Sequence, residues 1–263
     1  MDKVSHASAR TTLGIALSAT LVLGGVALGA PASGAQPAGR PAPPSPSTSV
    51  GYGGAVSSVD AEASAVGLEV LRKGGNAADA AVATAAALGV TEPYSAGIGG
   101  GGYFVYFDAD TGEVSTIDGR ETAPAGMSAD AFINPATGQP YPFATAVSSG
   151  RSVGVPGTLA TWEAALEEFG TSSLKDALKP AILIATRGFR VDETFVQQTA
   201  SNQDRFSLFP DTAELFLPNG APPQVGSTFK NPDLAKTLRE IALRGTEAFY
   251  EGAIADEIAA IVR

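Results

Sequence analysis

The sequence predicts an α+β fold, and three features carry that prediction. The stretch NAADAAVATAAALGV at 76–90 predicts a helix so rich in alanine that it fits a fully buried position. The strand signature YFVYFD at 103–108 is followed, after the turn ADTG, by the alternating EVSTID at 113–118, which is typical of a hairpin. From Pro156 onward the pattern is predominantly helical.

Residues 1–35 are predicted to be a secretory signal rather than part of the fold. A basic start precedes an apolar run at 13–30 without any charge, and Ser33 and Ala35 suit the −3 and −1 positions of a signal peptidase site. The run is also long enough for a membrane anchor, but its glycine and alanine content favours removal. Removal implies a secreted or cell-envelope protein without membrane association.

Residues 36–50 are rich in proline and serine and are predicted to be a disordered linker. This leaves 51–263 as one domain with room for a sizeable core. The chain carries a formal net charge of −10, with 17 basic and 27 acidic residues, and no lysine and arginine cluster interrupts this balance. Because such clusters dominate binding to phosphate backbones, the sequence argues against nucleic acid as a partner.

Missing residue types narrow the chemistry of this chain. It has no cysteine, and its one histidine, His6, lies in the predicted signal. Disulfides, thiolate metal sites, Ser-His-Asp catalysis and Cys-His catalysis are therefore excluded within it. We expect neither a metal nor a cofactor. Proton transfers by an enzyme of this composition need carboxylates, lysines, tyrosines or an α-amino group.

Ahead of the hairpin, a first helix is predicted at 57–76. Ser57 or Ser58 is its expected N-cap, and Gly74 marks its end. The alanine-rich helix that follows is expected to pack in the core and to have no direct chemical role.

Behind the hairpin, helices are predicted at 156–170, 172–189 and 191–202. Pro180 lies inside the second of them and is expected to break or kink it. The proline-rich stretch 203–230 is predicted to be a surface excursion.

A further helix is predicted at 231–245, where Asn231 is a suitable N-cap, Pro232 fits the first helical position and Gly245 follows the end. Helical periodicity continues through 251–263. No capping glycine or polar tail follows it, so we expect the carboxyl end to be cut short.

The stretch EPYSAGIGGGGYFVYFD at 92–108 satisfies G-x-G-x-x-G, with Gly97, Gly99 and Gly102 in register. A dinucleotide-binding loop needs a strand before the glycines and a helix after them, whereas here the predicted order is reversed. No Lys-Ser/Thr pair completes a P-loop either. We therefore interpret the glycines as positions where a Cβ would collide with a neighbouring layer or where the backbone needs a positive φ.

Five segments stand out in order along the chain: GGNAADAAVAT (74–84), TEPYSAGIGGGGYFVYFD (91–108), DGRETAPA (118–125), VGVPGTLATW (153–162) and NPDLAKTLREIALRGTEAFYEGAIADEI (231–258). Together they resemble the large subunit of γ-glutamyltransferases, also called glutathione hydrolases. The resemblance covers 51–263. It implies the N-terminal-nucleophile hydrolase fold, an αββα sandwich of two packed sheets between helical layers, incomplete in this chain.

The resemblance also implies a precursor that cleaves itself into a large N-terminal and a small C-terminal subunit. In that family the new N-terminal threonine of the small subunit is the nucleophile, and its own α-amino group can act as base. That threonine lies downstream of every matched segment, so we assign no catalytic residue in this chain. The implied partners are the small subunit of the same precursor and a γ-glutamyl small-molecule or peptide substrate.

Arg120, in DGRETAP, is the site residue that the resemblance assigns. It implies that Arg120 pairs with the α-carboxylate of the γ-glutamyl group, and a guanidinium can grip a carboxylate through two parallel hydrogen bonds. The alternative is an exposed arginine that pairs with Asp118 or Glu121. We expect Glu121 and Pro124 to shape the loop.

Two other functions stay open at this point. One is a cephalosporin or glutaryl acylase of the same fold, because related precursors use similar motifs on other amides. The other is a non-catalytic truncated remnant. Such a remnant is expected to fold poorly, because strand edges and apolar faces would lie open.

Overall fold

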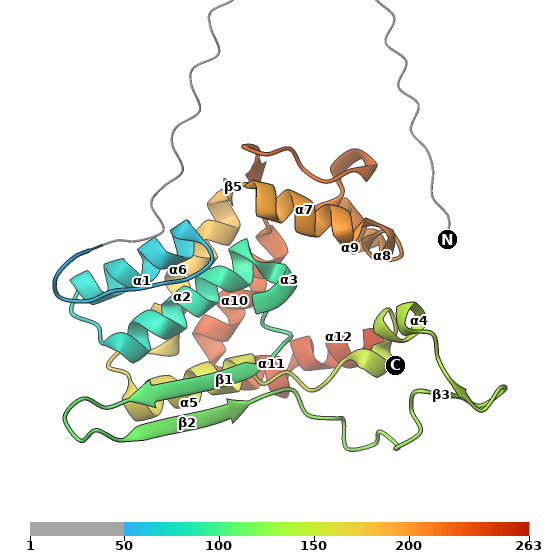
Figure 1. Ribbon diagram of the computed structural model, residues 1–263, viewed down its shortest axis with the longest axis horizontal. Coiled ribbons are helices and arrows are strands. Elements are labelled where there is room, and N and C mark those ends of the chain that lie inside the picture. Colours follow the sequence, from blue (N-terminus) through green and yellow to red (C-terminus); the bar gives the residue numbers. More distant parts are fainter. Residues whose placement is uncertain (1–49, 263) are drawn as a thin grey trace, which may run out of the picture. The chain divides into compact units, whose positions relative to one another are not determined.

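A computed structural model describes residues 50–262 of the chain. The predicted signal 1–35, and the predicted linker except its last residue, lie outside the described residues. The described part is mainly helical and contains three antiparallel sheets of two strands each, of which β1–β2 and β3–β4 are hairpins (Figure 1). No helix within it has both the length and the apolar character needed to cross a bilayer.

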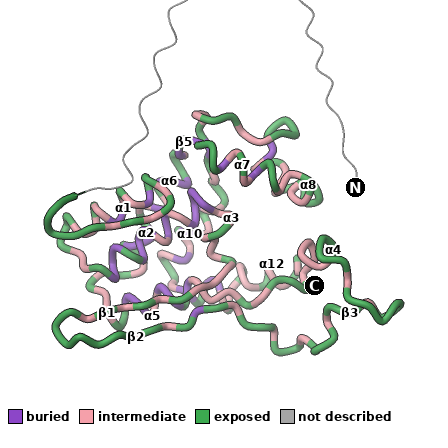
Figure 2. The backbone as a smooth tube through the Cα atoms, in the orientation of Figure 1, coloured by how far each residue is buried: buried purple, intermediate pink, exposed green. Residues whose placement is uncertain are grey.

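Four helices, which we call the helical layer, form the centre of the core. Their bounds are Ala61–Arg72 (α1), Ala77–Thr91 (α2), Leu174–Arg187 (α6) and Pro232–Arg244 (α10). Helix α2 packs against both α1 and α6, and α6 packs in turn against α10. Eleven of the fifteen residues of α2 are buried, which confirms the expected core position of the alanine-rich helix (Figure 2). Its small side chains allow neighbouring backbones to come close on every side.

Polar caps fix the start of each of the first two helices. Asp60 caps α1 by accepting a hydrogen bond from the backbone N–H of Ala63 at 2.7 Å, so the predicted caps Ser57 and Ser58 are wrong. Asp is as good an N-cap as Ser, and it stands one residue before the helix begins. Gly74, at φ +91°, follows the end of α1 as predicted.

Helix α2 begins with a capping box made by Asn76 and Asp79. Asp79 is also buried, and its carboxylate accepts hydrogen bonds from the backbone N–H groups of Thr171 and Ser172, both at 2.9 Å. The hydroxyl of Thr171 donates a further bond at 2.6 Å. One carboxylate thus joins the start of α2 to the loop that precedes α6.

The predicted hairpin is present as β1 (Gly102–Phe107) and β2 (Val114–Gly119), paired in register from Gly102 opposite Gly119 to Phe107 opposite Val114. Its inner face packs on helix α5 (Thr158–Phe169), where the ring of Tyr106 stacks 4.3 Å from that of Phe169 (Figure 1).

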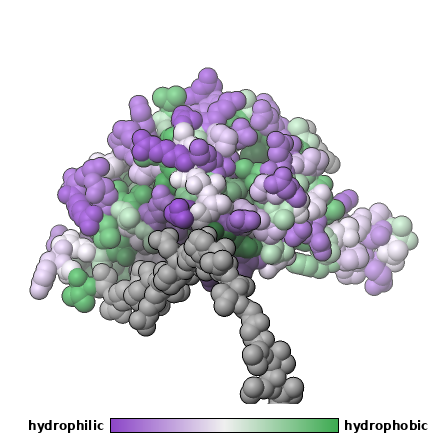
Figure 3. Space-filling view, turned by 90° about the horizontal axis from the view of Figure 1, so that it is seen from above, coloured by the Kyte–Doolittle hydropathy of each residue, from purple (hydrophilic) through white to green (hydrophobic). Residues whose placement is uncertain are grey.

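The outer face of β1 is open. Tyr103, Val105 and Phe107 are 68%, 66% and 62% exposed. Such a continuous apolar row differs from the face seen in Figure 3, where hydrophobic residues are scattered among hydrophilic ones. The hairpin therefore presents one covered and one uncovered face among residues 50–262.

The glycine-rich stretch leads from the short helix α3 (Pro93–Ala96) into β1, so the helix-before-strand order is confirmed. Of the seven glycines between 97 and 119, Gly112 in the hairpin turn has a positive φ of +75° and the other six do not, so among those six close approach is the reason to test. A Cβ on Gly101 would collide with the backbone of Gly119, and one on Gly157 would do the same. Gly99 and Gly102 have open space instead.

Two sequence predictions in the second half need adjustment. Pro180 does not break α6, since the helix continues on both sides and buries Leu178 and Ala181 in the core. The stretch 203–230 lies mostly at the surface, as predicted, with Leu217 and Phe229 as its buried residues, but it is not without regular structure. It forms α8 (Gln203–Phe206), α9 (Pro210–Phe216), the 3₁₀ turn η2 (Pro218–Gly220) and β6 (Thr228–Phe229).

An aromatic cluster explains why 203–230 is ordered. Strand β6 pairs with β5 (Phe189–Arg190), and Phe229 lies 4.8 Å from the ring of Phe195 in helix α7 (Glu193–Ser201). Phe216 of α9 lies 5.3 Å from Phe229. Burial of these rings outweighs the proline content of the stretch.

The remaining elements are mostly short. They are β3 (Ile133–Asn134), β4 (Gln139–Pro140), α4 (Phe143–Val147), the 3₁₀ turn η1 (Gly150–Ser152), α11 (Glu247–Tyr250) and α12 (Ala253–Val262). The predicted caps of α10 are confirmed, because Asn231 accepts from the N–H of Leu234 and Gly245 follows the last turn.

Candidate substrate-binding site

Arg120 directly follows strand β2, and the backbone around it is fixed on both sides. Its own N–H donates to the carboxylate of Asp118 at 3.1 Å. Two residues later, Thr122 and Val155 exchange backbone hydrogen bonds of 3.3 and 2.8 Å. This antiparallel bridge brings the two ends of residues 120–156, which we call the arginine segment, side by side.

The side chain of Arg120 is 61% exposed, and its Nε lies 3.5 Å from Oε2 of Glu121. The local contacts are thus those of an arginine paired with its neighbour. That Glu121 oxygen is buried and has no hydrogen bond. An ion pair with one partner this exposed contributes little stability, and the exposed guanidinium of Arg120 is accessible to a second carboxylate.

Arg120 and Glu121 line a cavity of about 500 Å³ within the arginine segment. Arg151 enters the same cavity from the other end of the segment, and Met127, Phe132 and Val153 add apolar wall. Two arginines and one glutamate are the charged groups of this lining, so the cavity favours an anion.

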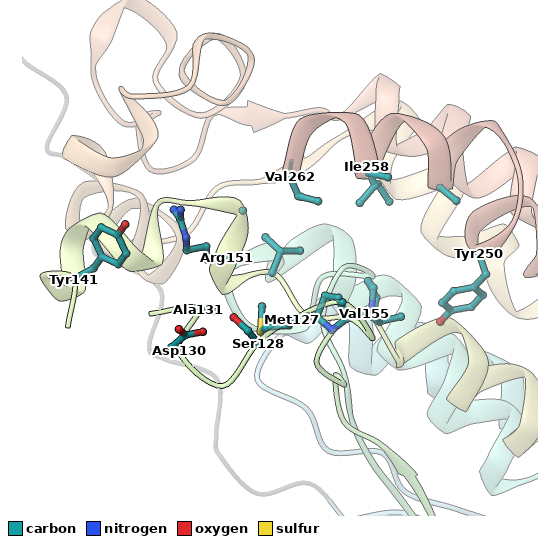
Figure 4. A pocket seen from close by; sticks show the side chains of 18 of the residues that line it. Met127, Ser128, Asp130, Ala131, Tyr141, Arg151, Val155, Tyr250, Ile258 and Val262 are labelled. Atoms are coloured by element: carbon teal, nitrogen blue, oxygen red, sulfur yellow. The ribbon is translucent and has the colours of Figure 1, made fainter. Parts of the chain in front are cut away.

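A second cavity, of about 770 Å³, adjoins the first and shares Met127, Arg151 and Val153 with it. Figure 4 shows Ile258 and Val262 of α12 on one side and Met127 and Val155 on the other. Most of its lining is apolar.

Polar groups of this second cavity are held by local contacts. The guanidinium of Arg151 lies over the ring of Tyr141, 5.1 Å from the ring centroid. Hydrogen bonds from the Ser128 hydroxyl and from its own backbone N–H lower the pKa of the Asp130 carboxyl. Burial raises the pKa of Tyr250, whose hydroxyl accepts from the N–H of Ala160 at 3.2 Å.

Sequence reasoning identified Arg120 but not Arg151 or Tyr141. Arg151 stands two residues before the VGVPG motif, and that proximity is the signal that points to it. Tyr141 follows a two-residue hairpin strand that carries no pattern. Within residues 50–262, no three His, Asp, Glu or Cys side chains are grouped so as to hold a metal ion.

Comparison with known proteins identifies the family of the chain. Residues 63–263 match the family described as gamma-glutamyltranspeptidase. The chain belongs to this family. It is 43% identical over 214 residues to the glutathione hydrolase proenzyme of Bacillus subtilis strain 168, which covers 81% of this chain and 36% of the relative. It is 36% identical over 246 residues to the Escherichia coli K12 glutathione hydrolase proenzyme, covering 89% of this chain and 42% of the relative. This member thus spans well under half the length of these curated relatives.

Solved structures agree with the sequence matches. The crystal structure of Helicobacter pylori gamma-glutamyltranspeptidase aligns with a TM-score of 0.75 at 35% identity, covering 80% of this chain and 60% of that one. Cephalosporin acylase from Bacillus halodurans aligns at 0.67 and 32% identity, covering 76% and 37%. These matches confirm the predicted fold class, and the gamma-glutamyltranspeptidase member described here contains part of the N-terminal-nucleophile hydrolase fold.

Proposed function

We propose that this chain is the substrate-binding and scaffold part of a γ-glutamyltransferase precursor. The complete protein would cleave the γ-glutamyl amide of glutathione-like donors and pass the acyl group to water, an amino acid or a peptide. The family match over residues 63–263 carries this proposal, and the relatives named glutathione hydrolase proenzymes support it.

Within that reaction, the proposed role of Arg120 is to bind the α-carboxylate of the donor. Its position on an anion-favouring cavity supports the role. Each charge-assisted hydrogen bond to a carboxylate contributes about 1.5–3 kcal/mol. Binding would exchange the solvent-exposed contact with Glu121 for a two-pronged contact with the substrate.

The bond-breaking step is proposed to belong to the small subunit. Its N-terminal threonine would attack the γ-carbonyl, the amide C–N bond would break, and the leaving amine would take up the proton that the threonine hydroxyl loses. Water or an amine then releases the acyl group. This division would leave residues 50–262 with binding and positioning.

Replacing Arg120 by Lys in the full-length gene product tests the proposal. A lysine keeps the charge but loses the planar pair of donors, so KM for a γ-glutamyl anilide should rise about tenfold, as expected for one lost bond. Arg244→Lys is the matched control, because Arg244 is 73% exposed at the end of α10 and lines neither cavity. An unchanged KM in the Arg120 variant would remove that residue from the site.

A second candidate is an acylase that acts on glutaryl or cephalosporin amides, supported by the match to the Bacillus halodurans cephalosporin acylase. A glutaryl group keeps the carboxylate that Arg120 is proposed to bind, but it lacks the α-amino group of a γ-glutamyl donor. A γ-glutamyltransferase should also recognise that amino group, so the full-length protein should prefer γ-glutamyl anilide over glutaryl anilide. The opposite preference would favour the acylase.

We propose on the sequence of residues 1–35 alone that the protein is exported and that the signal is cleaved after Ala35. The disordered linker proposed at 36–50 would then form the new N-terminus. N-terminal sequencing of the protein recovered outside the cytoplasm should begin at Gln36. A start at Met1 in membrane fractions would instead support an anchor.

A further inference from the structure

Arg151 gives the Arg120 cavity a second guanidinium without a partner. Its side chain is exposed, and no carboxylate of residues 50–262 lies within 4.0 Å of it. The ring of Tyr141 packs against the flat face of the Arg151 guanidinium. The N–H donors at the edge of the guanidinium therefore stay available to an acceptor.

The charge of the cavity lining leaves Arg151 unmatched. Glu121 compensates Arg120, with which it pairs, and no second carboxylate lines this cavity of about 500 Å³. Asp130 lines the adjoining cavity together with Arg151, but the two side chains form no ion pair within 4.0 Å. The cavity of about 630 Å³ between α1 and α6 has the opposite balance, since its charged lining is four carboxylates and two lysines: Glu62, Glu69, Asp79, Asp176, Lys73 and Lys179. In a chain with net charge −10, an unmatched cation in a cavity indicates a site for an anionic group.

The chain geometry allows the two arginines to bind the two ends of one ligand. They lie on opposite sides of the Thr122–Val155 bridge, Arg120 two residues from it and Arg151 four residues from it along the partner stretch. Extended backbone geometry therefore limits the distance between their Cα atoms to about 20 Å. A ligand of three residues, about 10 Å long when extended, is short enough to lie between the two side chains within that limit.

We propose that Arg151 binds the distal carboxylate of the donor while Arg120 binds its α-carboxylate. This inference rests on the proposed function and names its substrate class: γ-glutamyl peptides with a free carboxyl end, in preference to γ-glutamyl amides that are neutral at that end. The apolar cavity beyond Arg151, with Met127 and Val153 at its mouth, would receive the side chain of the residue next to that carboxylate.

The test compares glutathione with its glycine amide as ligands of the full-length protein. Wild type should show a kcat/KM about tenfold higher for glutathione, because the amide lacks the distal charge. Arg151→Gln should abolish this preference by lowering kcat/KM for glutathione about tenfold. Arg120→Lys should lower kcat/KM for both donors alike, and Arg244→Gln should change neither.

Calorimetric binding of the same two ligands separates this inference from the proposed function. If the protein turns over neither donor but binds glutathione more tightly than the amide, and Arg151→Gln removes that difference, the function fails and the distal site stands. A wild-type protein that does not discriminate between the two ligands overturns the distal site. So does an Arg151 variant that keeps the wild-type preference.

Discussion

The helical layer and the arginine segment differ in how each is held in place. Helix α2 alone buries eleven of its fifteen residues, whereas none of residues 120–156 is buried. The layer is fixed by apolar packing and by caps, and the segment by one backbone bridge and by hydrogen bonds within its own turns. Binding residues are commonly carried by exposed connections on a rigid scaffold, and the binding roles proposed for Arg120 and Arg151 would follow that division.

The comparison also indicates where free energy of folding resides. Local opening is easiest where few apolar contacts are buried. We therefore expect substitutions in the helical layer and its aromatic cluster to act on stability, and substitutions in the arginine segment to act on ligand binding.

The largest expected effect comes from Phe195→Ala. Phe195 is 1% exposed and contacts the rings of Tyr94, Phe189 and Phe229. Its removal leaves a cavity and should lower the free energy of unfolding by about 3–5 kcal/mol, measured by urea denaturation. Phe132→Ala is the matched change in the arginine segment. Phe132 is 42% exposed, so a loss similar to that of Phe195→Ala would contradict the contrast between the regions.

Gly157→Ala tests the junction between the regions. An added Cβ would collide with the carbonyl of Gly119, where the start of α5 meets the end of β2. We expect a loss of about 1–3 kcal/mol in the free energy of unfolding, from overpacking. Gly126→Ala is the control within the arginine segment, because nothing lies within 4 Å of a Cβ there. Equal melting temperatures for the two variants would argue against the close approach.

Asp79→Asn should reduce the acid sensitivity of the helical layer. Burial acts to raise the pKa of Asp79, but the hydrogen bonds from Thr171, Asn76 and Ser172 outweigh it and the net shift is downward from 3.8. A lowered folded-state pKa contributes stability that is present above pH 3.8 and is lost as the pH falls through the folded-state pKa.

The Asp79→Asn variant should therefore be less stable at pH 7, by about 1–3 kcal/mol for the lost charged acceptor, and should approach wild type as the pH falls below the lowered folded-state pKa of Asp79. Thermal melts between about pH 2 and pH 7 measure the difference. A gap between the two proteins that stays constant over this range would contradict the assignment.

Glu121→Gln has the smallest expected effect on stability. The ion pair with Arg120 is mostly exposed on the arginine side, so the free energy of unfolding should change by less than about 1 kcal/mol. The variant frees Arg120, and affinity for a γ-glutamyl donor should stay the same or rise slightly. A fall in the melting temperature as large as that of Phe195→Ala would instead give Glu121 a structural role.

Features set by local sequence signals could be predicted, whereas features set by long-range packing could not. The alanine-rich helix, the hairpin and the caps of α10 were all predictable, because periodicity, turn chemistry and capping residues are local signals. The unbroken helix through Pro180 and the short elements within 203–230 were not predictable, since long-range packing of Leu178 and of the rings around Phe229 overrides the local preference. In the site, Arg120 came from a motif, whereas Arg151 needed the Thr122–Val155 bridge to bring it to the same cavity.

The exposed face of β1 has a consequence for the self-association of residues 50–262 in solution. Tyr103, Val105 and Phe107 form a ladder on a ribbon whose two borders both have unpaired backbone groups. Two such hairpins can associate in solution through their exposed apolar faces and unpaired strand edges. Light scattering by residues 50–262 should therefore increase steeply with protein concentration. A second sheet packed on Tyr103, Val105 and Phe107 would prevent this association. The solubility of residues 50–262 would then measure whether the proposed small subunit has assembled with them.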